Sequence, residues 1–484
     1  MGILNDAITF SSKIKWPTQN TGRQVASVIV SNPQTFHVDG TTTFSSSLEA
    51  ARINYRTKRF SSPEPGDLMH STEGMRLTTS SMICWRLTSN SLKSLSNKAN
   101  AFKNERLELS HLSQSRVFNI RNYGAPNGDI TNALKSAWKD ACASITPSKV
   151  VVPSGWYKLQ QIDLEGPCNA PIEVQVRGKI LAPKDPSHLN GQDQWVRFQY
   201  INFFTLSGRG TFDGQGEMAW TQNDCGKNTN CKRLAMNFGF AFLNNSIIQD
   251  INSKDSKYFH VNVFGCNNIT FTNFNINAPE TSPNTDGIHI GRSTKVKIIN
   301  SKIGTGDDCI SLGDGSRQIT VRNVTCGPGH GISVGSLGKY PNEEPVVDLT
   351  VKNCTLNNTD NGVRIKTWPG TSVVSIASHL HFEDIIMVNV TNPVIIDQEY
   401  CPWNQCSKKS PSKIKIRKVL FKNIRGTSAT QEGVALVCSR GVPCEAIVLS
   451  DIDLSFNGSK VIAKCANVKP TIRRKAPICM VPHV

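Results

Sequence analysis

Apolar residues recur in a short pattern through the second half of the chain. Each copy has two apolar residues separated by one position, and an Asn or Asp follows two positions later. Clear copies begin at Ile269, Val296, Ile319, Leu349, Leu380, Val419 and Ile447, and a weaker first copy runs from Ile248 to Asn252. The copies start roughly 20 to 40 residues apart, which is typical of a solenoid whose coils differ through their loops. The pattern therefore predicts strands stacked in successive coils.

A second pattern in the same stretch joins a polar turn to a short strand. Four segments superpose, at 286–290, 308–312, 330–334 and 361–365. Their equivalent positions should form columns, because parallel strands of neighbouring coils lie about 4.8 Å apart. The residues expected to face outward in one column are His289, Ser311, Ser333 and Arg364. Their apolar neighbours should pack inside the coil, because side chains alternate along a strand.

The predicted folded part follows a long polar segment. Residues 1–114 are rich in Ser, Thr, Asn and Arg without a sustained apolar period, so we predict a disordered or foreign extension there. Residues 115–484 form the second predicted unit, a single domain that opens with a strand-like segment at 117–125. A helix at 131–142 follows, and we expect it to cap the first coil and shield its edge. Its apolar face carries Ala133, Leu134, Ala137, Trp138 and Ala141.

The composition narrows the class of partner. With 35 Gly and 24 Pro, the chain favours strands and turns over helices. The formal charge of +17 predicts an acidic partner, which could be nucleic acid, an anionic membrane or an acidic polysaccharide. The sequence has no recognisable nucleic-acid-binding module and no apolar run that would span a membrane. The charge by itself therefore does not choose the partner, although these absences count against nucleic acid and a spanned membrane.

Fifteen cysteines without the spacing of zinc ligands predict disulfides and hence export. Close pairs are Cys309/Cys326, Cys401/Cys406, Cys438/Cys444 and Cys465/Cys479, further candidates are Cys225/Cys231 and Cys142/Cys168, and Cys84, Cys266 and Cys354 are left over. Glycosylation acceptors of the Asn-x-Ser/Thr type also fit export and lie at Asn244, Asn268, Asn323, Asn353, Asn357, Asn389 and Asn457. The first residues, MGILNDAITFSSKIKW, lack the apolar run of a secretory signal. The predicted location outside the cell therefore rests on the cysteines and acceptors.

The superposed turns bring charged residues to one outer face of the solenoid. These residues are Asp286, Asp307, Asp308, His330, Arg364 and Lys366. A single Asp at such a turn more often caps backbone groups than catalyses a reaction. Three together favour chemistry, because glycoside cleavage needs a carboxylic acid to protonate the leaving oxygen and a carboxylate to activate water. Crowded carboxylates retain a proton at mild pH, and the cations suit the carboxylates of an acidic sugar chain.

The motifs in these turns resemble those of a known family. In chain order they are GRGTFDGQG at 208–216, NTDG at 284–287, GDD at 306–308, GHG at 329–331 and RIK at 364–366. They resemble the signature segments of the polygalacturonases, glycoside hydrolase family 28, and the chain is most similar to the plant pollen-type exopolygalacturonases. Repeat and resemblance together predict an all-β fold, a right-handed single-stranded parallel β-helix with an N-terminal capping helix. The resemblance implies hydrolysis of the α-1,4 bonds of polygalacturonate in pectin, from chain ends and with inversion. It implies a secreted, monomeric enzyme of the cell wall that binds this acidic polysaccharide and uses no cofactor.

The resemblance also implies roles for single residues. The catalytic residues would be Asp286, Asp307, Asp308 and His330, and the substrate-binding residues Arg364, Lys366 and Tyr400, with no metal. Among these, Asp307 would be the general acid, and Asp286 and Asp308 would hold the attacking water. His330 would tune the protonation of the acid. Stacked coils bring carboxylates closer than the separation of about 6.5 to 9.5 Å usual in inverting enzymes, so this separation does not predict the stereochemistry here.

Two alternatives stay open at this point. In a pectate lyase, which would share the fold and the substrate, Asp307 and Asp308 could bind Ca²⁺, and the product would be unsaturated. An inactive pectin-binding β-helix would hold the polyanion by charge alone. Such a protein would bind better without the three aspartates, so their presence argues against it. Resolving the products formed from polygalacturonate distinguishes the three hypotheses.

Overall fold

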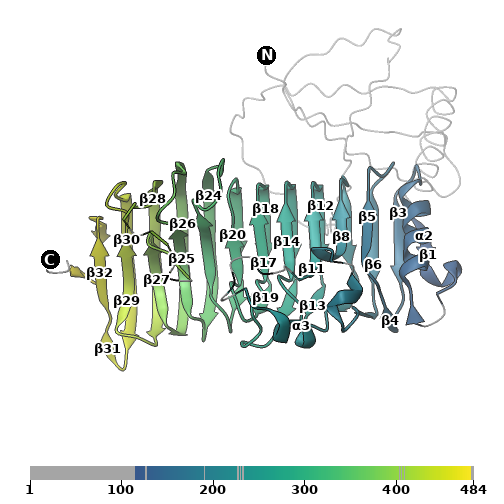
Figure 1. Cartoon of the computed structure of the whole chain (residues 1–484), viewed down its shortest axis with the longest axis horizontal. Coiled ribbons are helices and arrows are strands. Elements are labelled where there is room, and N and C mark those ends of the chain that lie inside the picture. Colours follow the sequence, from purple (N-terminus) through teal and green to yellow (C-terminus); the bar gives the residue numbers. More distant parts are fainter. Residues whose placement is uncertain are drawn as a thin grey trace, which may run out of the picture. The chain divides into compact units, whose positions relative to one another are not determined.

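The computed structural model describes residues 115–480, apart from 126–127, 190, 226–227, 229–230, 232–233, 403, 405 and 408. The extension predicted at 1–114, and Cys84 within it, lie outside the described residues. Figure 1 shows the strands of the described part stacked in successive coils, with helix α2 (Thr131–Cys142) beside the first of them. The predicted right-handed parallel β-helix is confirmed, with the hand that parallel connections within one sheet nearly always have.

Two sheets form the coils of the described residues. The smaller has twelve strands: β5 (Ile162–Glu165), β8 (Gln194–Gln199), β11 (Met236–Ala241), β14 (Val261–Phe264), β17 (Ile288–Gly291), β20 (Ile310–Leu312), β23 (Ile332–Leu337), β25 (Asn361–Thr367), β27 (Asn392–Asp397), β29 (Glu432–Val437), β32 (Ile462–Ala466) and β34 (Cys479–Met480). The larger has 22: β1 (Arg116–Asn119), β2 (Gly128–Asp129), β3 (Ser148–Val152), β4 (Trp156–Lys158), β6 (Ile172–Val176), β7 (Lys179–Leu181), β9 (Phe204–Ser207), β10 (Thr211–Asp213), β12 (Asn244–Gln249), β13 (Asn252–Lys254), β15 (Asn267–Thr272), β16 (Asn275–Asn277), β18 (Thr294–Ile299), β19 (Lys302–Gly304), β21 (Arg317–Arg322), β22 (Thr325–Cys326), β24 (Val346–Asn357), β26 (Ser375–Val390), β28 (Ile414–Ser428), β30 (Glu445–Phe456), β31 (Ser459–Lys460) and β33 (Thr471–Arg473). Among these strands, only the pairing of β30 with β31 is antiparallel.

The strand register confirms the repeat and corrects its first copy. Ile269 pairs with Val296, as the sequence pattern predicts, and the later copies stay in the same register. Ile248, however, pairs with Phe271 and not with Ile269, so the copy predicted at Ile248 to Asn252 is wrong by two residues. Ser246 occupies the first inward position instead and is buried, its hydroxyl donating to Asn244 O. A Ser can be buried at this inward position because its hydroxyl has a hydrogen-bond partner, so the apolar pattern is interrupted there.

The Asn or Asp that ends each copy lies at a bend of the larger sheet. Asn273, Asn300 and Asn323 have φ values of 51°, 51° and 55°, in the left-handed region that Asn tolerates better than most residues. Their side chains also bond between coils, since Asn323 Nδ2 donates to Asn300 Oδ1 at 3.0 Å and Asn273 Nδ2 donates to Asp250 Oδ1 at 3.0 Å. The polar residue of the repeat is therefore a turn former that is cross-linked from coil to coil.

Helix α2 closes the first coil as predicted. The five residues of its predicted apolar face are all buried, and Trp138 meets Phe198 and Phe204 edge to face. The preceding strand is shorter than predicted, because β1 ends at Asn119 and the 3₁₀ turn η1 (Ile120–Tyr123) follows. Asn119 starts that turn by accepting a hydrogen bond from Arg121 N. No helix in the described part is long and apolar enough to cross a membrane, and the two other helical pieces, η2 (Pro186–Leu189) and α3 (Glu217–Gln222), are short.

Six disulfides join the six cysteine pairs that the sequence spacing suggests. They are Cys142–Cys168, Cys225–Cys231, Cys309–Cys326, Cys401–Cys406, Cys438–Cys444 and Cys465–Cys479. Cys266 and Cys354, left unassigned from the sequence, are reduced and buried. Each bridge joins residues close in the chain, so the disulfides fasten single loops and coil ends.

Candidate active site

A cleft of about 710 Å³ lies over the smaller sheet and contains every site residue that the sequence predicts. It is lined by Cys225, Asn228, Cys231, Met236, Tyr258, Phe259, Asn262, Asn284, Asp286, His289, Asp307, Asp308, Ser311, Gly313, His330, Gly335, Ser336, Lys339, Tyr340, Arg364, Lys366, Trp368, Tyr400 and Pro402. The column predicted from the superposed turns is also present, since His289 pairs with Ser311, Ser311 with Ser333 and Ser333 with Arg364. Ser311 and Ser333 face outward as predicted, toward Asp286 and Asp308, but both are buried beneath the charged residues.

The turns before three successive strands place the acids and the histidine side by side. Gly287 N donates to Asp308 O at 2.8 Å, and His330 N donates to Asp307 O at 2.7 Å, so backbone bonds fix each turn on the next. Gly331, after His330, has a φ of 76°, and a Cβ there would lie 1.9 Å from Asn361 O. A larger residue could not fit at this position, which explains the second Gly of the GHG motif.

Asp308 is held as a carboxylate by two cations. Its Oδ1 accepts hydrogen bonds from Arg364 Nη2 at 2.7 Å and Ser333 Oγ at 2.8 Å, and its Oδ2 accepts one from Lys366 Nζ at 2.8 Å. Burial would raise the pKa of Asp308, but the charges of Lys366 and Arg364 outweigh burial and lower the pKa to about 2. Asp308 is therefore ionised over the whole range of mild pH.

The pKa of Asp286 is shifted in the opposite direction to that of Asp308. Only 6% exposed, Asp286 accepts one hydrogen bond from Ser311 Oγ at 3.0 Å. Burial and the neighbouring charges of Asp307 and Asp308 raise the pKa of Asp286 well above its usual value. The three acids therefore retain a proton at mildly acidic pH, and because they are coupled the proton belongs to the cluster as a whole.

Asp307 is the acid that is most open to the cleft, with a side chain 19% exposed. His330 Nδ1 lies 2.9 Å from Asp307 Oδ1, and Asn284 Nδ2 donates to Asp307 Oδ2 at 3.4 Å. Burial lowers the pKa of His330, but the hydrogen bond and the charge of Asp307 dominate and raise the pKa above its usual value. A protonated His330 therefore lies beside Asp307 at mildly acidic pH.

The predicted substrate-binding cations both contact Asp308, which the sequence did not indicate. Arg364 has five N–H donors, and its bonds to Ser333 and Asp308 take two of them. Lys366 has three donors and uses one on Asp308. Both side chains still line the cleft, so each can contact a ligand while it fixes Asp308. Arg364 and Lys366 therefore have two roles: they lower the pKa of Asp308, and they form part of the cleft wall.

Tyr400 forms the next part of the wall. Lys366 Nζ lies 5.2 Å from the centre of its ring, and the Trp368 ring lies 5.5 Å away, nearly perpendicular. Burial raises the pKa of Tyr400, against the charges of Lys366 and Arg364, so the phenol is neutral and can donate a hydrogen bond. Trp368 lies two residues after the RIK motif, but no repeated pattern in the sequence marked it as a residue of the cleft wall.

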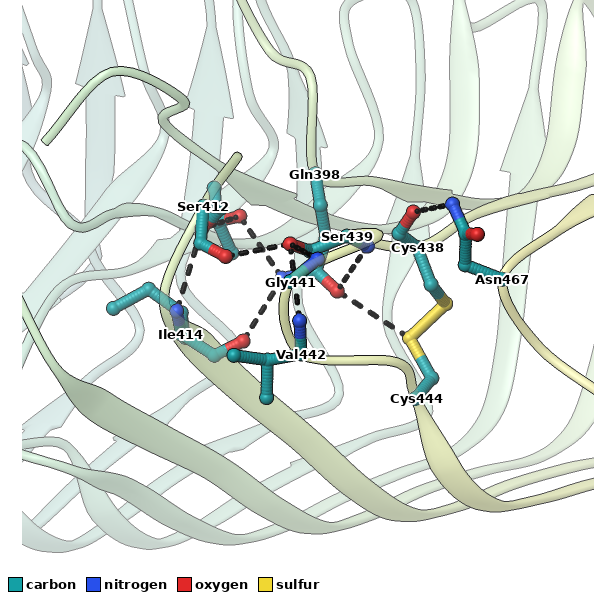
Figure 2. Close-up of a disulfide and its surroundings, with 10 residues drawn as sticks. Gln398, Ser412, Ile414, Cys438, Ser439, Gly441, Val442, Cys444 and Asn467 are labelled. Carbon is teal, nitrogen blue, oxygen red and sulfur yellow. Dashed lines mark hydrogen bonds between the residues drawn. A yellow bond between two sulfur atoms is a disulfide. The ribbon is translucent and has the colours of Figure 1, made fainter. Parts of the chain in front are cut away.

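A buried polar network behind the wall anchors the chain near Tyr400, as Figure 2 shows for the part around the Cys438–Cys444 disulfide. Gln398 Nε2 donates to Ile414 O at 2.9 Å, and Gln398 Oε1 accepts from Ser439 N at 3.0 Å. Ser439 Oγ in turn donates to Ser412 O at 2.6 Å. These bonds join both ends of the segment between β27 and β28 to the next coil, so the loop that carries Tyr400 starts from a fixed position.

The site fits a metal ion poorly. Oxygen or nitrogen atoms of Asp307, Asp308 and His330 lie within 4.8 Å of one another, which is close enough to share an ion. Calcium, however, takes six to eight oxygen ligands, and both oxygens of Asp308 already face the cations Arg364 and Lys366. A Ca²⁺ ion here would be repelled by these two charges. The donor set therefore argues against the calcium site of the lyase hypothesis.

Comparison with known proteins identifies the family. The family model described as Glycosyl hydrolases family 28 matches residues 142–478. The chain belongs to this family. A protein named Polygalacturonase from Medicago sativa is 60% identical over 379 residues, which is 76% of this chain and 89% of the relative. A protein named Exopolygalacturonase from Oenothera organensis is 55% identical over 350 residues, which is 72% of this chain and 96% of the relative.

Solved structures of family 28 and related enzymes share the fold at low identity. The crystal structure of endo-xylogalacturonan hydrolase from Aspergillus tubingensis has a TM-score of 0.62 and 23% identity, and it covers 72% of this chain and 96% of that one. A hyperthermoactive exopolygalacturonase from Thermotoga maritima has a TM-score of 0.57 and 17% identity, over 76% of this chain and 96% of that one. At these identities the similarity shows only that the β-helix fold is shared. The substrate has to be inferred from the residues of this chain's own site.

Proposed function

We propose that this protein hydrolyses the α-1,4 bonds of polygalacturonate and acts from the chain end, releasing galacturonate. The observation that carries the proposal is the meeting of Asp286, Asp307 and Asp308 with Arg364 and Lys366 in one cleft. A proton-retaining carboxylate cluster suits glycoside hydrolysis, and adjacent cations suit a substrate with a carboxylate on each sugar. The names of the plant relatives support both the substrate and the action at chain ends.

In this proposal Asp307 is the general acid. It is the most exposed of the three acids, and His330 beside it keeps positive charge near the proton that it transfers. With the shared proton of the cluster on Asp307, the carboxylates of Asp308 and the deeper Asp286 orient the water, and Asp286, whose pKa is raised, accepts its proton. The proton balance of hydrolysis then closes within the cluster. Attack by this water from the face opposite the leaving group inverts the anomeric centre. Carboxylate oxygens of Asp307 and Asp308 lie within 4.8 Å of one another, so this enzyme would be an exception to the usual carboxyl separation of inverting enzymes.

Arg364, Lys366 and Tyr400 bind the uronate next to the cleaved bond in this proposal. Arg364 offers a planar fork to the carboxylate, Lys366 offers a point charge, and the neutral Tyr400 offers a hydroxyl. A lyase is disfavoured because the cluster fits Ca²⁺ poorly. An inert pectin binder is disfavoured because Asp286 and Asp307 would repel a polyanion without any compensating chemistry.

The same proposal places the enzyme outside the cell, in the wall, as a monomer that binds neither nucleic acid nor membrane. Six disulfides in the described part suit an oxidising compartment. The seven glycosylation acceptors are all exposed. We assign catalysis to the unit 115–484, and we retain the prediction that residues 1–114 are an extension dispensable for it.

One assay tests this function directly. The purified protein is incubated with polygalacturonate, and the products are resolved by size while ultraviolet absorbance reports unsaturated ends. Early release of galacturonate without that absorbance is the expected result. A rise in absorbance that depends on calcium would show a lyase, early mid-length oligomers would show internal cleavage, and intact polymer would show an inert binder.

A further inference from the structure

The cleft continues beyond the residues that the proposed function uses. Past Tyr400 its wall is formed by Trp368 and by Lys339 and Tyr340, which lie in the loop that follows strand β23. All three line the same cleft as the acids. Lys339 and Tyr340 follow β23 and Trp368 follows β25, whereas His289 lies on β17, nearer the N-terminal end of the solenoid.

Lys366, Tyr400, Trp368, Lys339 and Tyr340 form a row along the cleft wall, in which each side chain contacts the next. Lys366 Nζ lies 5.2 Å from the centre of the Tyr400 ring, and the Tyr400 and Trp368 rings are 5.5 Å apart. Beyond them, Lys339 Nζ lies 5.1 Å from the centre of the Trp368 ring and 5.3 Å from that of Tyr340. The wall therefore presents a second ammonium group, separated from Lys366 by the two rings.

The loop that carries Lys339 is held in place by a carboxylate. Glu343 accepts hydrogen bonds from the backbone N–H groups of Gly338 at 2.5 Å, Lys339 at 2.9 Å and Tyr340 at 2.8 Å. Trp368 N donates to Leu337 O at 2.8 Å, which joins the start of the loop to the next coil. The carboxylate of Glu343 thus binds backbone N–H groups of the loop. Because these bonds fix the backbone at Lys339, less conformational entropy is lost when its ammonium group binds a ligand.

We propose that Lys339, above the Trp368 ring, binds the carboxylate of the uronate one position beyond the uronate held by Arg364 and Lys366. This inference rests on the proposed function and extends it to chain length. Polygalacturonate carries one carboxylate on every sugar, so a second fixed cation along the cleft fits a second uronate of the same chain. The flat faces of Trp368 and Tyr400 suit the apolar C–H faces of sugar rings between the two charges. The enzyme should therefore prefer a substrate of three sugars to one of two.

The test compares kcat/KM on digalacturonate and trigalacturonate for the wild-type protein and three variants. Lys339→Gln removes the charge, and Lys339→Arg keeps it. Lys297→Gln removes one charge at an exposed position of β18, in the larger sheet and outside the cleft lining. In Lys339→Gln, the ratio of kcat/KM for the trimer to that for the dimer should fall about fivefold, as for the loss of one partly exposed charge contact. Lys339→Arg should restore most of this ratio, and Lys297→Gln should keep the wild-type ratio. Added salt should reduce the trimer preference of the wild type.

Each other outcome has a distinct meaning. A wild-type protein that hydrolyses both oligomers, with an unchanged ratio in Lys339→Gln, would overturn the outer site and leave the proposed function standing. An equal loss on dimer and trimer would overturn it too, because Lys339 would then act at the cleaved bond or on the fold. A wild-type protein that releases no galacturonate from either oligomer would overturn the proposed function and this inference together.

Discussion

The ammonium of Lys366 lies 2.8 Å from Oδ2 of Asp308, and both side chains are at least nine-tenths buried. Nη2 of Arg364 lies 2.7 Å from Oδ1 of the same carboxylate. The two residues that would bind the substrate are thus also those that keep Asp308 ionised. A change at either residue should therefore alter both affinity and the pH dependence of the reaction.

Lys366→Met should show both effects. The variant keeps an unbranched side chain but removes the charge that lowers the pKa of Asp308, so this pKa should rise from about 2. Because Asp308 acts as a carboxylate in the proposed reaction, the acid limb of the kcat profile should move to higher pH, and KM should rise. A full pH profile of kcat and KM checks this. Lys302→Met on β19, an exposed position of the larger sheet, is the control, and an unmoved acid limb in Lys366→Met would contradict the prediction.

Asp307→Asn should stop the reaction while the substrate still binds. The amide keeps the shape of the side chain but cannot donate the proton, and losing general acid catalysis costs typically about 10²- to 10⁴-fold in rate. The loss should appear in kcat and not in KM. Asp163→Asn on β5, an exposed Asp outside the cleft lining, is the matched control. Near-normal kcat in Asp307→Asn would move the acid role to another residue of the cluster, with Asp286 first.

The pKa of His330 should depend on Asp307. Asp307 stabilises the imidazolium, so removing its charge in Asp307→Asn should lower the pKa of His330. The wild-type histidine should accordingly stay protonated to higher pH than the variant. NMR titration of the histidine ring protons measures both values, with His330→Gln used to assign the signal. Equal pKa values in the two proteins would show that the 2.9 Å contact has no electrostatic effect.

Asn300→Ala should destabilise the β-helix more than Asn300→Gly. Asn300 has a φ of 51° and accepts a hydrogen bond from Asn323 at 3.0 Å. Alanine loses this bond and is strained at a left-handed φ, which together should lower the free energy of unfolding by about 2 kcal/mol. Glycine loses only the bond and suits the backbone, so its effect should be smaller. Urea unfolding midpoints of the three proteins provide the comparison, and an equal loss in both variants would show that the backbone conformation is not what selects Asn.

Much of the fold followed from local pattern. The alternation around Ile269 and Val296 predicted the coils, and the apolar face of helix 131–142 predicted the cap, because burial inside a coil imposes the same periodicity on every turn. The predicted position of the first copy was wrong, because Ser246 occupies its first inward position and its buried hydroxyl bonds to a nearby backbone oxygen where an apolar side chain was expected. The strand predicted at 117–125 stopped at Asn119, because a side chain to backbone bond starts a turn there.

The sequence by itself determined which charged residues share one face of the solenoid, because a fixed register converts spacing along the chain into neighbourhood between coils. Only the tertiary structure decided how these charges pair. Asp308 receives both cations and stays ionised, Asp286 receives none and tends to keep a proton, and Asp307 faces His330 and the cleft. Such differences depend on distances of a few ångströms and on burial, which set each pKa. Likewise, no periodicity in the chain could place Lys339 above Trp368, because two loops of different coils meet there.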